Sequence, residues 1–165
     1  GLHGHAGPGG AAAHGELVHV PAMLADAAGR MAGQRHGGLA VPADLGATLV
    51  EIVSGWAAEC GAASLRRGVS LVTLLESWTC AARDRVVAVT RGGAAVVTPR
   101  WHCVASGGRI ALFAKPDDYF ELCDVADRCS AAAEELGGLA AAAAAGDAAR
   151  AWSVDLSAAV TGEPV

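Results

Sequence analysis

The strongest constraint on the fold is a pair of hairpin patterns in the middle of the chain. Runs rich in valine and threonine flank residues 91–93, and a second pair of apolar runs flanks residues 106–108. Both short segments contain a Gly-Gly pair. Extended runs on either side of a short glycine turn are typical of antiparallel hairpins. The sequence therefore predicts a small antiparallel sheet of about four strands within residues 85–114.

Helical patterns precede this region. Proline at a first helical turn predicts helices that begin at Pro21 and Pro42, and Ser70 is the expected N-cap of a third helix. The second of these has the clearest apolar stripe at helical spacing, formed by Leu45, Leu49, Ile52, Val53, Trp56 and Cys60. The first helix is expected to end at His36, and the three are expected to pack together.

Helical patterns also follow the sheet. A helix is predicted to begin at Pro116 and to end at Gly137-Gly138, with alanine-rich helix after it. Trp152, Leu156 and Val160 share one face of a last predicted helix. Helices before and after a separate antiparallel sheet indicate an α+β fold, with the C-terminal helices packed on the sheet.

The supply of large apolar side chains limits the size of the core. Of 165 residues, 39 are alanine and 22 are glycine. Residues 1–15, rich in glycine, histidine and alanine, cannot bury enough surface to offset the entropy of ordering, so they are expected to form a flexible arm. Residues 16–160 are expected to form a single domain, and residues 161–165 a frayed tail. Because the sequence starts at Gly1 and not at a methionine, the chain is expected to be a fragment of a longer protein.

Charge is distributed unevenly along the chain. The net charge is −5, whereas residues 62–115 carry eight basic and two acidic groups, or +6. A net negative charge argues against a general nucleic-acid binder, and no stretch is apolar over the length of a membrane span. The eleven arginines against one lysine are typical of a high-GC genome. The basic middle between acidic flanks favours a protein partner, and the oligomeric state stays open.

The five cysteines bear on the cellular compartment. Their number is odd and no pair has C-x-x-C spacing, so at least one thiol is free unless it pairs with another chain. Free buried thiols favour a reducing compartment such as the cytoplasm. Secretion stays open, because Gly1 need not be the native N-terminus.

Two sets of residues were weighed as chemical sites. The Gly1 amine with His3, and the neighbouring His5, offer nitrogen ligands that suit Cu(II). Cys103 is a candidate nucleophile, but His102 beside it on a strand points to the opposite face and cannot serve as its base. No catalytic motif occurs in the sequence, so no cofactor is expected and an enzyme is the less favoured class.

The favoured hypothesis is a non-catalytic interaction or accessory module. Its expected partner surface contains Phe120, placed opposite the apolar face of the helix predicted from Pro116. Five arginines of the middle segment are expected to form a solvated rim, and three of them are expected to complete this surface: the rim is Arg83, Arg85, Arg91, Arg100 and Arg109, and the surface takes Arg91, Arg100 and Arg109. The alternatives are a small enzyme that uses Cys103 or a histidine near this rim, and a metal-binding N-terminal arm.

Overall fold

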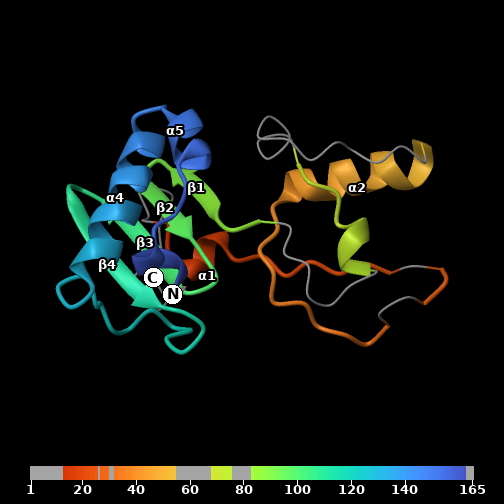
Figure 1. Cartoon of the computed structure of the whole chain (residues 1–165), viewed down its shortest axis with the longest axis horizontal. Helices are drawn as coiled ribbons and strands as arrows, with labels where there is room; N and C mark the ends of the chain where they lie inside the picture. The colour runs from red at the N-terminus through yellow and green to blue at the C-terminus, as the bar shows by residue number, and fades with distance from the viewer. Residues whose placement is uncertain (1–12, 26, 30–31, 55–67, 76–82, 163–165) are drawn as a thin grey trace. The chain divides into compact units, whose positions relative to one another are not determined.

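The computed structural model describes residues 13–25, 27–29, 32–54, 68–75 and 83–162 (Figure 1). The chain divides into two compact units. Unit 1 combines Gly1–Val20 with Val87–Val165, and unit 2 is Pro21–Val86. The prediction of one domain over residues 16–160 stays a prediction, and each unit is described by itself. Across the described ranges, helices are too short or too polar for a bilayer crossing.

Unit 1 is built on a four-stranded antiparallel sheet, as the sequence predicted. Its strands are β1 (Val86–Thr90), β2 (Gly93–Val97), β3 (Trp101–Ser106) and β4 (Arg109–Ala114), in the order β1-β2-β3-β4. The register pairs Cys103 with Val96 on β2 and with Leu112 on β4. The turn between β3 and β4 requires glycine, because Gly107 and Gly108 both have positive φ.

Helices cover one face of this sheet (Figure 1). They are α4 (Ser130–Ala144), α5 (Ala148–Ser153) and α6 (Ala158–Thr161). The buried side chains between these helices and the sheet include Val96, Cys103, Leu112, Leu136, Leu139, Ala140, Ala151 and Val160. Many are small, so α4 lies close to the strands, and a Cβ at Gly137 would collide with Ile110. The thin core expected from the composition is thus closely packed in unit 1.

The opposite face of the sheet is covered by the N-terminal segment, residues 13–18. Its residues Gly15–Val18 form α1. Ala13 is fully buried against Ala95, Val104 and Phe113, and Val18 packs on the same cluster. The last three residues of the predicted arm, 13–15, therefore belong to the fold, while residues 1–12 lie outside the described residues.

The helix predicted from Pro116 is wrong, because residues 115–129 form turns and α4 begins only at Ser130. Two aspartates explain the difference. The Asp118 carboxylate accepts hydrogen bonds from the amides of Leu122 and Cys123, and the Asp124 carboxylate accepts from those of Leu112 and Ala126. Side chains that capture nearby amides in this way compete with helix formation.

The predicted stop at Gly137-Gly138 is also wrong, since α4 runs through both glycines. Glycine costs a helix about 1 kcal/mol relative to alanine. Gly137 is buried on the side of α4 that faces the sheet, where a Cβ would overlap the Ile110 side chain unless that side chain moved. The last predicted helix is divided into α5 and α6, with Asp147 capping α5 through the Arg150 amide.

Unit 2 contains α2 (Pro42–Ser54) and the 3-10 helix η1 (Val72–Leu75). The predicted helix from Pro21 to His36 is wrong, because its described residues form turns and extended chain, with Gly29 and Gly33 at positive φ. The helix beginning at Pro42 is confirmed as far as Ser54. The third helix predicted from Ser70 is, in its described part, only the 3-10 helix η1, and Ser70 lies two residues before it and accepts a hydrogen bond from the Val72 amide at 3.3 Å.

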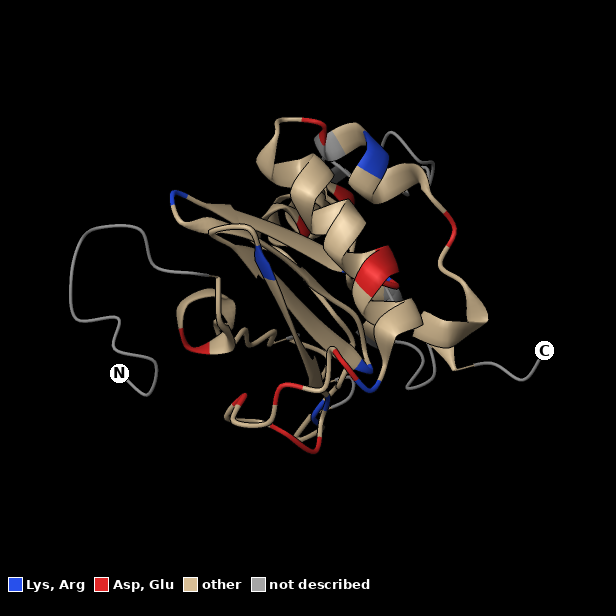
Figure 2. Cartoon of the chain, turned by 90° about the vertical axis from the view of Figure 1, so that its left-hand side faces the viewer, with Lys and Arg blue, Asp and Glu red and all other residues tan. Residues whose placement is uncertain are grey.

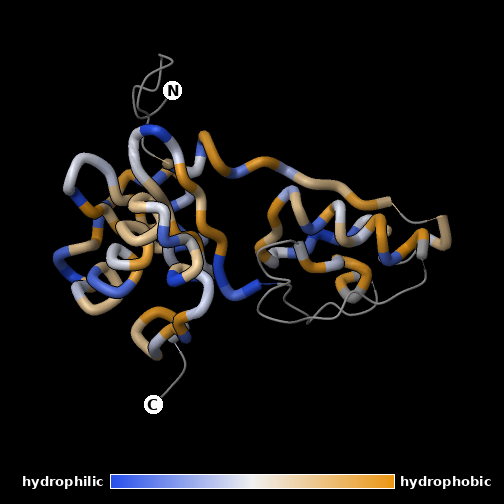
Figure 3. The backbone as a smooth tube through the Cα atoms, turned by 90° about the horizontal axis from the view of Figure 1, so that it is seen from above, coloured by the Kyte–Doolittle hydropathy of each residue, from blue (hydrophilic) through white to orange (hydrophobic). Residues whose placement is uncertain are grey.

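The buried side of α2 differs from the predicted one. Leu49, Ile52 and Val53 of the apolar stripe are exposed, whereas Asp44 and Thr48 are fully buried. Figure 3 shows hydrophobic and hydrophilic residues along this helix. Asp44 accepts hydrogen bonds from the amides of Val41 and Val69 and from Arg83, which places a polar cluster at the centre of unit 2. Of the remaining stripe residues, Leu45 is also exposed, and Trp56 and Cys60 lie outside the described residues.

Candidate functional site

Four donors converge on the carboxylate of Glu121. Oε1 accepts from His102 Nδ1 at 2.6 Å and from Lys115 Nζ at 3.1 Å, and Oε2 accepts from His14 Nδ1 at 2.8 Å. The Gly15 amide lies 3.1 and 3.2 Å from the two oxygens. These five residues, named here the Glu121 cluster, join the N-terminal segment, β3, the end of β4 and the loop that follows it.

His102 contacts a second acceptor within the same cluster. Its Nε2 lies 3.0 Å from the carbonyl oxygen of Ala13, while its Nδ1 faces Glu121. A carbonyl and a carboxylate can only accept, so both ring nitrogens must donate for both bonds to form. The arrangement therefore fits an imidazolium paired with a carboxylate, with each side chain only 2% exposed.

Burial alone would raise the pKa of Glu121, but its hydrogen bonds and charged neighbour outweigh that effect. The hydrogen bond and positive charge of His102, together with the bonds from His14 and the Gly15 amide, hold the pKa of Glu121 well below its usual range. Glu121 also has a φ of 57°. This left-handed conformation costs a non-glycine residue about 1 kcal/mol, which the converging donors offset.

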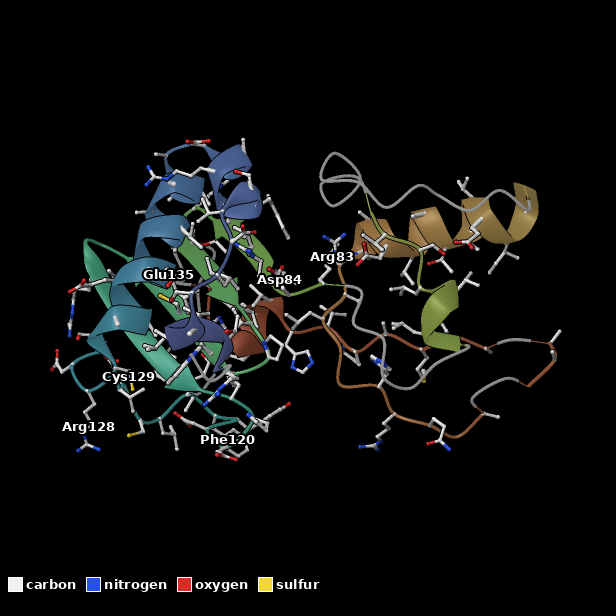
Figure 4. The ribbon with its side chains drawn as sticks, in the orientation of Figure 1. Arg83, Asp84, Phe120, Arg128, Cys129 and Glu135 are labelled. Atoms are coloured by element: carbon white, nitrogen blue, oxygen red, sulfur yellow. The ribbon has the colours of Figure 1, made fainter. Side chains whose placement is uncertain are left out.

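Turning the Glu121 side chain inward leaves its neighbours on the surface. Tyr119, Phe120 and Leu122, named here the aromatic loop, are 65%, 56% and 73% exposed. The rings of Tyr119 and Phe120 meet edge to face at 5.1 Å, and His19 of the N-terminal segment lies 6.4 Å from Tyr119. Figure 4 shows Phe120 on the loop beyond the end of the sheet.

The loop returns along β4 and covers the edge of the sheet. The Val125 amide donates to the Leu112 carbonyl at 2.8 Å, and the Leu112 amide donates to Asp124 at 3.0 Å. These bonds pair backbone groups that an edge strand would otherwise present to other chains. The aromatic loop is thus fixed to the sheet on both sides.

The structure separates the residues of the expected partner surface. Arg100 lies at the end of the sheet from which the aromatic loop continues, because its carbonyl oxygen accepts a hydrogen bond from the Lys115 amide at 2.7 Å. Arg91 and Arg109 are exposed at the two hairpin turns, which lie at the opposite ends of the same strands. Phe120 and Arg100 are therefore on one end of unit 1, and Arg91 and Arg109 are on the other.

Two further arginines of the expected rim are buried in unit 2, which corrects the prediction that they are solvated. Arg83 forms an ion pair with Asp44, in which both side chains are 0% exposed. Arg85 pairs with Asp84 at 2.7 Å, and its own side chain is 4% exposed. For Arg83 the partner is an internal carboxylate 39 positions away, which the sequence spacing did not associate with it, whereas the Asp84 side chain that pairs with Arg85 is 58% exposed.

The candidate metal ligands His3 and His5 lie outside the described residues. Within the ranges that the structure describes, no group of three or more His, Cys, Asp or Glu side chains is arranged to hold a metal ion. In the Glu121 cluster, the histidine nitrogens that face the carboxylate serve as hydrogen-bond donors to it, which accounts for their proximity without an ion.

Cys103 is fully buried beneath α4, on the face of the sheet opposite His102, as strand alternation predicted. Burial and the nearby negative charge of Asp124 raise the pKa of the Cys103 thiol to about 12. The thiolate, which is the nucleophilic form, is therefore disfavoured at this position. Cys60 and Cys80 lie outside the described residues.

Thiol labelling of the native protein should distinguish Cys103 from the exposed Cys123. A rise in pKa from 9 to about 12 lowers the thiolate fraction at neutral pH about a thousandfold. We expect iodoacetamide to modify Cys123 at least about a hundred times faster than Cys103, and both at similar rates after unfolding. Peptide mass spectrometry measures both rates, and equal rates in the native protein would contradict the burial of Cys103.

Comparisons with protein-family models, with curated proteins and with solved structures find no match to this chain. The candidate site therefore rests on its own residues. Glu121 and Lys115 were not identified from the sequence, because a loop glutamate and lysine carry no local pattern. The exposure of Phe120 was anticipated, although it arises from a turn and not from the polar side of a helix.

Proposed function

We propose that unit 1 is a non-catalytic interaction module that binds a partner protein through the aromatic loop. The observation that carries this proposal is the exposure of Tyr119, Phe120 and Leu122 together on one short loop. Large aromatic side chains supply much of the binding energy of protein interfaces, and grouped exposed apolar residues mark such sites on soluble folds.

The loop is ordered before any partner binds, which supports its use in recognition. Lys115 Nζ donates to the carbonyl oxygens of Asp118 at 2.9 Å and Tyr119 at 3.1 Å. The Asp118 carboxylate in turn accepts from two amides of the same loop at 2.9 and 3.0 Å. A surface that is already fixed loses less conformational entropy on binding.

Charge around the loop narrows the class of partner. Asp117, Asp124 and Asp127 are exposed in the same segment of the chain as the aromatic loop, with Arg128 as an exposed cation of that segment. Figure 2 shows acidic residues in red along the turns at one end of the sheet. An apolar pocket bordered by basic side chains is the complementary surface, because opposite charges steer association and suppress other partners.

The small-enzyme alternative has less support. A catalytic group must reach its substrate, but Cys103 and the side chains of His102 and Glu121 are all buried. Their hydrogen bonds are also directed to one another or to backbone groups. Copper binding by an arm that contains His3 and His5 remains a separate proposal, which rests on the sequence alone.

Site-specific crosslinking tests the docking role. We expect a photoreactive residue at position 120 to capture one partner from the native lysate, and the same residue at Val89 to capture none. Val89 is a matched control because it is also 56% exposed. With the captured partner purified, Phe120→Ala should weaken binding at least about tenfold, whereas Val89→Ala should leave the Kd unchanged.

Two outcomes would contradict the proposal. One is an equal set of adducts from positions 120 and 89, which would indicate random collision. The other is a Kd that Phe120→Ala does not alter. Asp117→Lys gives a further readout, since loss of a steering charge should slow association and reduce the dependence of the on-rate on salt.

A further inference from the structure

The N-terminal segment is held on the sheet by polar contacts as well as by apolar ones. It supplies three groups to the Glu121 cluster: the Ala13 carbonyl, the His14 ring and the Gly15 amide. Beside them, Ala13 fills the apolar cluster with Val104 and Phe113. The docking of this segment therefore depends on which atoms of the Glu121 cluster carry protons.

We propose that the Glu121 cluster is a pH-dependent latch, which holds the N-terminal segment on the sheet while His102 carries both ring protons and releases it when His102 loses one. The latch is a property of the isolated chain, so this proposal does not depend on the docking role of the aromatic loop.

When His102 loses one proton, either the Glu121 carboxylate or the Ala13 carbonyl loses its hydrogen-bond donor. Neutral histidine has a single N–H, and His102 retains it on Nδ1, where the Glu121 carboxylate is the stronger acceptor at 2.6 Å. The lone pair of Nε2 then faces the Ala13 carbonyl oxygen at 3.0 Å. Two acceptors in contact repel each other, and burial keeps water from bridging them. The segment must therefore move away at residue 13.

The other ionisable groups around His102 do not replace the lost bond. His14, from the N-terminal segment, and Lys115, from the end of β4, both donate to Glu121 rather than to the Ala13 carbonyl. The Asp118 carboxylate accepts hydrogen bonds from loop amides. The Tyr119 carbonyl accepts from Lys115 Nζ, which also lies 6.0 Å from the centre of the Tyr119 ring. Glu16, on the segment itself, is exposed.

The ionisation of the Glu121 carboxylate decides whether the latch opens as the pH rises or as it falls. Burial works to raise the pKa of Glu121, but the bonds from His102, His14 and the Gly15 amide lower it below the usual range. The carboxylate therefore stays ionised at mildly acidic pH and remains an acceptor for the His102 ring. The latch is closed under those conditions and opens as the pH rises, which uncovers Phe113 and Val104 on the sheet.

Hydrogen exchange in the full-length chain tests the latch. The amides of Leu17 and His19 donate within the segment at 2.9 and 2.7 Å, so their protection reports on its docking. We expect their protection factors to fall at least about tenfold between about pH 5.5 and pH 9, while that of Cys103 in the sheet stays constant. His102→Gln should remove the pH dependence, and the control His36→Gln, at a histidine of unit 2, should retain it.

A direct measurement on the wild-type chain keeps the test decisive if His102→Gln fails to fold. Nitrogen-15 chemical shifts of the His102 ring report whether one or both nitrogens carry a proton. Loss of the second proton should coincide with the fall in protection of Leu17 and His19. Protection factors that do not change with pH, or a segment that stays protected while His102 is neutral, would overturn the proposal.

Discussion

Replacing Glu121 by glutamine is expected to lower the free energy of unfolding of unit 1 by about 3 kcal/mol. Every group that contacts the carboxylate is a donor: two histidine nitrogens, one ammonium and one amide. The NH2 group of glutamine would face donors wherever it pointed, and the positive charge of His102 would lose its buried counter-ion. Chemical denaturation followed in the wild-type and variant chains measures the difference.

Glu134→Gln is the matched control for Glu121→Gln, because Glu134 is an exposed glutamate on α4 of the same unit. Its replacement should change the free energy of unfolding by less than about 0.5 kcal/mol. Equal effects of the two substitutions would contradict the role assigned to the Glu121 cluster.

Acid unfolding provides a second readout for Glu121. Since the pKa of this carboxyl is lower in the folded chain than its ordinary value of 4.5, the unfolded chain binds a proton first as the pH falls. The stabilisation is complete above that ordinary value and is lost progressively at lower pH. Glu121→Gln should therefore reduce the loss of stability between about pH 5 and about pH 2, relative to the wild-type chain.

Replacing Asp44 by asparagine is expected to destabilise unit 2 by about 4 kcal/mol. The carboxylate accepts from the Val41 amide at 2.7 Å, from the Val69 amide at 2.7 Å and from Arg83 Nε at 2.9 Å. Burial raises the pKa of Asp44, but the bonds from Arg83 and the two amides lower it below its usual value. Asparagine would remove the negative charge of the side chain that forms the buried ion pair with Arg83.

Exchange of the Val69 and Leu71 amides locates this effect, because they donate to Asp44 and to Thr48 of α2. Their protection should fall with Asp44→Asn and should change little with Glu51→Gln, a half-buried glutamate on the same helix. Adding Arg83→Met to the Asp44→Asn variant should recover part of the stability, because the buried positive charge that Asp44 balanced is then removed as well. A variant as stable as the wild-type chain would show that the ion pair contributes nothing.

The hairpins were predictable because their signals are local. Alternating apolar residues and paired glycines act within a few positions, and Gly107 and Gly108 take up the positive φ that the turn needs. The failed helix boundaries have non-local or competing causes. At Pro116, the aspartates at positions 118 and 124 bind amides outside any helix, and at Gly137 contact with Ile110 sustains a helix that propensity would end.

The sequence by itself determined the four-stranded antiparallel sheet and the opposite orientation of His102 and Cys103. Only the tertiary structure brought together Ala13, His102 and Glu121, which are separated by as many as 108 positions in the chain. The physical reason is that a buried charge must find its partner in space. A buried carboxylate and its donors are stable only as a set, and no local spacing encodes which distant residues will complete it.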